Sequence, residues 1–193
     1  MHDASVGPPM SVEEWASLDD DDEVSPELVD GCLVEAEMPD FVHEMIVAWL
    51  CQVLRNWGRS RGALVATSVK LAVAPGRGRM PDLTVYLAGD ARPPARGVIR
   101  APPSIAVEIV SPTPRDGRRD RVEKSREYAA FGVRFYWLVD PELRTVEIFE
   151  RGRDGRYIHA AAIGDGVIDL VPGCEGLALD ASALWAEIDD LGT

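Results

Sequence analysis

Hydrophobic residues recur every three or four positions over 41–57, which predicts an amphipathic helix of that length. Gly58 and Gly62 follow this run and are expected to end the helix. A second helix is predicted over 118–131, where Gly132 provides a C-terminal stop. Two long helices separated by about sixty residues leave room for several strands between them.

Apolar runs bounded by glycine, proline or charged residues predict the strands. The run 104–110 is apolar apart from Ser104 and Glu108, which indicates a central strand buried on both faces. A short helix is expected after Ser11, which together with Glu14 forms a capping-box pattern. Further strands or hairpin arms are predicted at 26–37, 63–73, 82–88, 134–140, 145–151, 156–163 and 167–171, and a closing helix at 182–188.

The order of helix, mixed sheet, crossover helix and hairpin predicts an α/β sandwich in one domain. Residues 1–10 are expected to form a disordered tail, and residues 11–193 a single domain. Within that domain we expect a core over about 25–150, with the C-terminal strands and helix over 151–193. The glycine-rich stretch 76–79 is expected to be a turn.

Charge is distributed unevenly along the 193 residues. The formal net charge is −13, which by itself argues against a nucleic-acid ligand. Residues 1–44 contain 14 acidic residues and no Lys or Arg, whereas residues 92–134 contain ten basic residues and five acidic ones. The basic segment therefore favours a phosphate-bearing partner, although a solvated basic helix face would look the same.

Other broad classes are disfavoured by composition. No apolar run approaches the length of a membrane span, and the N-terminus does not have the pattern of a signal peptide. Cys32, Cys51 and Cys174 are odd in number and widely spaced, so they predict neither a disulfide framework nor a zinc site. A reducing cytoplasm is the expected location.

Two carboxylates stand within strand-like runs and are followed by one of only two lysines. Asp82 opens MPDLTVYL, Glu108 lies inside IAVEIV, and Lys124 follows in DRVEKSREY. A carboxylate in an apolar strand is costly unless it is paired or bound to a cation. We expect Asp82 and Glu108 to share Mg²⁺ or Mn²⁺, with the backbone carbonyl of Ile109 as a further ligand.

The predicted helix over 118–131 would bring further groups to this site. Asp120, Lys124 and Tyr128 are spaced by four and therefore share one helix face. Lys124 is expected to stabilise oxygens of a phosphodiester, with Asp120 or Tyr128 orienting it; an ordinary Asp–Lys helix pair is the alternative. Glu123 and Glu127 are expected to face solvent.

A resemblance follows from the strings PD, VEIVSPTPRD and DRVEKSREYAAFGVRFYWLVDP. Together with ELVDGCLVEAE they resemble a bacterial family of putative restriction endonucleases within the PD-(D/E)XK nuclease superfamily, over residues 10–150. The resemblance implies a restriction-endonuclease-like core, a central mixed sheet flanked by helices, with extra hairpins. It also implies a Mg²⁺-dependent nuclease that is commonly a homodimer, with Asp82 and Glu108 as metal ligands. The superfamily lysine position is occupied by Val110, and Lys124 on the following helix fits the family pattern.

Two more positions match the family pattern. Glu27 would extend the metal shell or form a salt bridge at a strand edge, and His43 would lie near the site or serve as a cap or packing residue. The loop SPTPRDGRRDR lies between Glu108 and Lys124, so its arginines are expected at the rim of the site. Candidates for contact with a nucleic-acid backbone are Arg115, Arg118, Arg119 and Arg121.

The expected function is a metal-dependent endonuclease that hydrolyses phosphodiester bonds, with DNA as the expected nucleic acid. Alternatives on the same fold are a nucleic-acid-binding protein without turnover and a protein-interaction module. Tyr136 and Trp137 are expected in the core rather than at a base-stacking surface.

Overall fold

The structure is a computed structural model that describes residues 9–18, 26–34, 38–111, 113 and 117–191. The expected disorder over 1–10 falls mainly on residues outside these ranges; Met10 donates its backbone N–H to the Gly31 carbonyl. None of the helices within the described ranges is long and apolar enough to cross a membrane.

A six-stranded mixed sheet forms the centre of the fold, in the order β10-β9-β8-β7-β6-β3. Only β7 and β8 are parallel, because the chain crosses over between them through a helix, while the other neighbours are antiparallel. The strands are β3 (Leu64–Thr67), β6 (Leu83–Tyr86), β7 (Ile105–Ile109), β8 (Phe135–Asp140), β9 (Thr145–Arg151) and β10 (Tyr157–Ile163).

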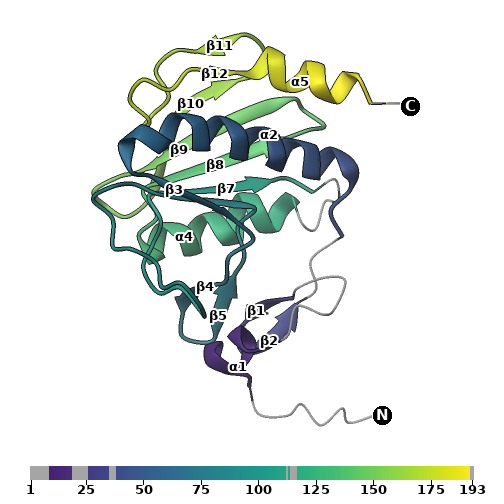
Figure 1. Cartoon of the computed structure of the whole chain (residues 1–193). Helices are drawn as coiled ribbons and strands as arrows, with labels where there is room; N and C mark the ends of the chain where they lie inside the picture. Colours follow the sequence, from purple (N-terminus) through teal and green to yellow (C-terminus); the bar gives the residue numbers. More distant parts are fainter. Residues whose placement is uncertain (1–8, 19–25, 35–37, 112, 114–116, 192–193) are drawn as a thin grey trace.

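Helices cover both faces of this sheet (Figure 1). One face packs against α2 (Phe41–Gly58) and α5 (Ala181–Asp189), and the other packs against α4 (Ser125–Phe131). A short 3₁₀ helix η1 (Arg59–Arg61) follows α2, and β11 (Val167–Ile168) pairs with β12 (Leu179–Asp180) before α5. The predicted α/β fold, a central mixed sheet flanked by helices, is confirmed.

The pleat of β7 determines which face receives each side chain. Ile105, Val107 and Ile109 join the core beneath α2, whereas Ala106 and Val110 join the core beneath α4. Successive residues in a strand point to opposite faces, so Glu108 faces the α4 side. The only carboxylate of this buried strand is therefore directed toward the crossover helix.

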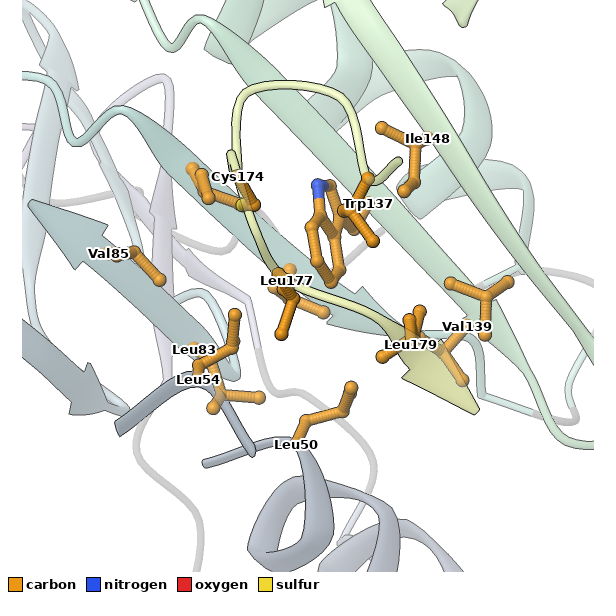
Figure 2. Close-up of a cluster of buried hydrophobic side chains, with 14 of the residues drawn as sticks. Leu50, Leu54, Leu83, Val85, Trp137, Val139, Ile148, Cys174, Leu177 and Leu179 are labelled. Carbon is orange, nitrogen blue, oxygen red and sulfur yellow. The ribbon is translucent and has the colours of Figure 1, made fainter. Parts of the chain in front are cut away.

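The main core lies between the sheet and α2 and is closed by the C-terminal segment (Figure 2). Trp137 and Val139 of β8 join Leu50 and Leu54 of α2 in this core, to which the loop before β12 adds Cys174 and Leu177, and β12 itself adds Leu179. Gly173 in this loop has φ +76, and a Cβ there would lie 2.1 Å from the Phe135 ring. Tyr136 and Trp137 are buried, as the sequence predicts.

A second, smaller sheet has the order β2-β1-β5-β4. Its strands are β1 (Glu27–Val29), β2 (Cys32–Val34), β4 (Leu71–Ala74) and β5 (Arg77–Arg79). The short helix α1 (Val12–Ala16) places Trp15 over Gly78, where a Cβ would lie 2.3 Å from the indole ring. A side chain at residue 78 would therefore exclude Trp15 from its position.

Two local predictions were wrong. The strand predicted over 63–73 is divided at Ser68, whose φ of 50° turns the chain, so β3 and β4 belong to different sheets. The turn predicted over 76–79 is largely strand β5. The helix predicted over 118–131 is present and ends at Gly132; its first part is a π-helix, η2 (Arg119–Lys124), which continues into α4.

Arg79 joins the small sheet to the crossover helix. Its side chain is fully buried, and its guanidinium donates to Glu27 Oε2 at 2.7 Å and to Glu127 Oε2 at 2.6 Å. Glu27 belongs to β1 and Glu127 to α4. Burial lowers the pKa of Arg79, but the two carboxylates raise it more, so the residue stays charged.

Replacement of Arg79 by Met is expected to lower the free energy of unfolding by about 3–5 kcal/mol, because it removes a fully buried positive charge that joins Glu27 to Glu127 and leaves the buried Glu27 with longer ion pairs only. The measurement is urea unfolding followed by circular dichroism. Arg100→Gln is the control, because its ion pair with Glu13 is exposed and contributes less than about 1 kcal/mol. Equal, small losses in the two variants would contradict the structural role of Arg79.

Candidate active site

Glu108 is held by two side chains from the crossover helix. Lys124 Nζ donates to Glu108 Oε2 at 2.8 Å, and the Tyr128 hydroxyl donates to Oε1 at 2.6 Å. All three side chains are buried. Lys124 ends the π-helix and Tyr128 lies one helical turn later, so both reach the same strand. Lys124 and Tyr128 thus lie on one helix face, as their spacing predicted, and Tyr128 contacts Glu108 instead of orienting Lys124 directly.

Lys124 is surrounded by carboxylates. Besides Glu108, its Nζ lies 3.1 Å from Asp120 Oδ1 and 3.5 Å from Glu27 Oε1. Although burial lowers the pKa of Lys124, the charges of Glu108, Glu27 and Asp120 raise it well above its ordinary value. An ammonium group has three N–H donors, and three carboxylates stand around this one.

The carboxylates at this position oppose one another's ionisation. Burial raises the pKa of Glu108 to about 8; Lys124 lowers it, while Asp82, Asp120 and Glu27 raise it further. The pKa of Asp120 is also raised, mainly by burial. Lys124 therefore faces more carboxylate than it neutralises alone, and Arg79 and Arg119 supply further positive charge at Glu27.

Asp82 lies at the start of β6 and joins a different set of groups. Its Oδ2 accepts the backbone N–H of Ile109 at 2.7 Å, and its Oδ1 lies 3.2 Å from His43 Nε2. Burial lowers the pKa of His43, but Asp82 and Glu44 raise it above its ordinary value. Asp40 caps α2 by accepting the His43 backbone N–H, which fixes His43 in the first helical turn.

A cleft of about 390 Å³ opens beside His43 and Ile109, the two residues that contact Asp82. Its walls include His43 and Val42 from the start of α2 and Ile109 from the end of β7, with Ser111 and Pro141 at the ends of neighbouring strands. The side chain of Asp82 is 19% exposed, whereas that of Glu108 is 3% exposed. The site thus has an accessible part at Asp82 and a buried part at Glu108.

The donor set fits a hard divalent cation. Each oxygen of Glu108 accepts one hydrogen bond and retains a second lone pair, and Asp82 contributes to the pKa of Glu108 through its charge. The N–H and C=O of one strand residue point the same way, so the Ile109 carbonyl is directed toward the Asp82 side. In the described part of the chain, no three His, Cys, Asp or Glu side chains form a ready metal cage, so water and main chain would complete the shell.

The arginines predicted at the rim have different environments. The side chain of Arg118 is 72% exposed, as expected for contact with a phosphate backbone. Arg119 is buried, with its Nε 4.0 Å from Glu27 Oε2, so it faces the carboxylate cluster instead of the rim. Arg121 donates to Asp140 at 2.5 Å and to Glu147 at 2.8 Å. Arg115 lies outside the described residues.

Sequence reasoning missed two residues of the site. Glu127, predicted to face solvent, instead accepts hydrogen bonds from Arg77 and Arg79. Arg79 also holds Glu27, which in turn lies beside Lys124. The alternation of Arg77, Gly78 and Arg79 directly before Met80 and Asp82 is a period-two strand signal that would have located Arg79 on one face of a strand.

The fold is shared with a solved structure described as a putative nuclease belonging to DUF820 from Anabaena variabilis ATCC 29413. The TM-score is 0.72 over 92% of this chain and 98% of that chain, at 18% sequence identity. A search of curated proteins found no match. A family profile described as Uma2, putative restriction endonuclease, matches residues 12–182, which includes every described residue of the site. This chain therefore belongs to the Uma2 family of putative restriction endonucleases.

Proposed function

We propose that this protein is a metal-dependent endonuclease that hydrolyses phosphodiester bonds in DNA. The observation that carries the proposal is the contact between Lys124 Nζ and Glu108 Oε2 at 2.8 Å, on the strand next to Asp82. The lysine position of the superfamily pattern is Val110 here, and a lysine from the following helix reaches the same carboxylate. Family membership supports a nuclease.

In this proposal Asp82, Glu108 and the Ile109 carbonyl hold Mg²⁺ or Mn²⁺. The bound ion would polarise the scissile phosphate and lower the pKa of a water molecule. Lys124 supplies a fixed positive charge next to Glu108, which stabilises negative charge that develops on phosphate oxygens. Asp120 and Tyr128 keep Lys124 and Glu108 in place through their own contacts.

His43 has an accessory role in the same proposal. It lines the cleft and its pKa is raised by Asp82 and Glu44 against the effect of burial, so it is well suited to donate a proton or contact a phosphate. Glu27 acts indirectly, because it contacts Lys124 and Arg79 at the buried side of the cluster. Homodimer formation, which the resemblance implied, stays a prediction.

One observation favours a second candidate, a nucleic-acid-binding or protein-interaction module without turnover. Three carboxylates stand within 3.5 Å of Lys124 Nζ, of which Glu108 accepts a hydrogen bond, and the Lys124 side chain is only 7% exposed. Lys124 can contact substrate only if one of those carboxylates moves or binds the metal. A tight Mn²⁺ site in a protein that never cuts DNA would support this second candidate.

The proposal predicts loss of cleavage in Asp82→Asn and in Glu108→Gln. Each variant removes a metal ligand while nearly preserving side-chain volume, so plasmid nicking with Mg²⁺ or Mn²⁺ should fall by on the order of 100-fold or more. The controls are Asp189→Asn and Glu123→Gln, whose carboxylates are exposed in surface ion pairs. Nicking by both site variants at the parental rate would refute the assignment.

The raised pKa of Glu108 predicts a pH-dependent stability in the absence of metal. The folded-state pKa of about 8 exceeds the ordinary value of 4.5, so the folded state retains a proton that the unfolded state releases. The stabilisation that the retained proton gives the folded state is complete below about pH 4.5 and is lost as the pH rises through about 8. Over this range the free energy of unfolding should fall by at most about 1.4 kcal/mol per pH unit.

The measurement is urea unfolding of the parent and of Glu108→Gln from about pH 5 to about pH 9, in buffers with a metal chelator. The parent should lose its stability relative to the variant up to about pH 8, after which the difference should level off. A difference between the two proteins that does not change with pH would contradict the raised pKa.

A further inference from the structure

A groove lies on the surface between α4 and the turn that joins β9 to β10, away from the cleft beside His43. Its volume is about 580 Å³, and its walls come from Ser125, Arg126 and Ala129 of α4 and from Gly155, Arg156 and Tyr157 of the turn. No acidic side chain lines this groove. In a chain with 33 acidic and 20 basic residues, such a surface is unusual.

The arginines at this groove differ from the other arginines of the crossover region in their ion pairing. Arg118, Arg121 and Arg134 each pair with a carboxylate. Within the described part of the chain, Arg126 and Arg156 have no carboxylate at ion-pair distance, nor has Arg153 on the same turn. Three positive charges are thus left without an internal partner where acidic residues are in excess.

Nearby carboxylates are already used elsewhere. Asp154 caps the turn by accepting the backbone N–H of Arg156 at 3.1 Å. Glu150 pairs with Arg134, and Glu127 accepts hydrogen bonds from Arg77 and Arg79 on the opposite side of α4. The positive charges of this surface therefore face solvent, where they can bind a ligand.

The two walls of the groove are fixed relative to each other. Arg151 Nε donates to the Ala129 carbonyl at 2.6 Å, which ties β9 to α4. Within the turn, Gly152 N–H donates to the Arg156 carbonyl at 2.7 Å. The Tyr157 hydroxyl donates to the Val133 carbonyl at 3.0 Å beyond the end of α4. A positively charged groove between rigid elements is preorganised for an extended anion.

The groove adjoins the helix that carries the candidate catalytic lysine. Arg126 is two residues beyond Lys124, and Ala129 lies about 8 Å further along the helix axis than Lys124 at 1.5 Å per residue. The cleft lies where β7 and β8 end, at Ile109 and Pro141, whereas the turn follows Arg151 beside Arg134, so the groove lies at the other end of the central sheet. Strand β8 joins these two ends with 6 residues, about 20 Å at 3.3 Å per residue, so a duplex bound at the site would meet this surface about six base-pair steps away.

We propose that Arg126, Arg153 and Arg156 form a docking surface for the phosphodiester backbone of duplex DNA at the end of the central sheet that lies away from the cleft. The inference rests on the proposed function, because it assigns the surface to the substrate of that site. Contacts of this kind position a duplex without reading its sequence. The surface is separate from the arginines of the 111–121 loop that the sequence predicted.

The test is fluorescence anisotropy of a labelled 20-base-pair duplex, with a metal chelator present so that binding is measured without cleavage. The triple variant R126Q/R153Q/R156Q should raise Kd at least tenfold at about 50 mM salt. It should also reduce the slope of log K against log salt by about 0.9 for each DNA phosphate that the variant no longer neutralises. The matched control is R55Q/R59Q/R96Q, exposed residues with the same change in charge, which should change Kd less than twofold.

Three outcomes would overturn the docking surface: equal Kd values for the two triple variants, no weakening in R126Q/R153Q/R156Q, or no binding by the parent. Nicking with Mn²⁺ separates this proposal from the proposed function. A parent that binds through these arginines but never nicks retains the surface and refutes the nuclease. If the parent and R126Q/R153Q/R156Q nick subsaturating DNA at the same rate, the nuclease proposal stands and the docking surface is refuted.

Discussion

The ion pair between Lys124 and Glu108 is the interaction on which the site and much of the fold depend. A carboxylate in the central strand is tolerated only with charged or hydrogen-bonding partners, and the crossover helix supplies both Lys124 and Tyr128. This contact fixes α4 against the sheet. It also places a positive charge that attracts Glu27 from the small sheet, which Arg79 holds from the other side.

The same contact divides the site into two parts with different properties. Glu108 and Lys124 are buried together, and burial raises the pKa of Glu108, whereas Asp82 contacts His43, which lines an open cleft. Lys124 ends a π-helix, a form of helix that occurs mainly as single turns and frequently at functional sites. Family membership gives these features a common explanation as a nuclease centre.

The sequence predicted those features that depend on local pattern. Glu108 stood out because it interrupts an apolar strand, and Lys124 and Tyr128 because their spacing by four places them on one helix face. Features that depend on contacts between residues far apart in the sequence were not predicted. The division of 63–73 at Ser68 and the burial of Arg79 and Glu127 follow from contacts between a second sheet and the crossover helix, and no short stretch of sequence encodes those contacts.

The most direct test of the central claim is anomalous diffraction from crystals of the parent protein soaked in Mn²⁺. We predict a manganese peak between Asp82 and Glu108 with the Ile109 carbonyl in its shell, and no such peak in crystals of Glu108→Gln. A well-ordered site in the parent that contains no manganese, with Glu108 still bound only to Lys124 and Tyr128, would contradict the account.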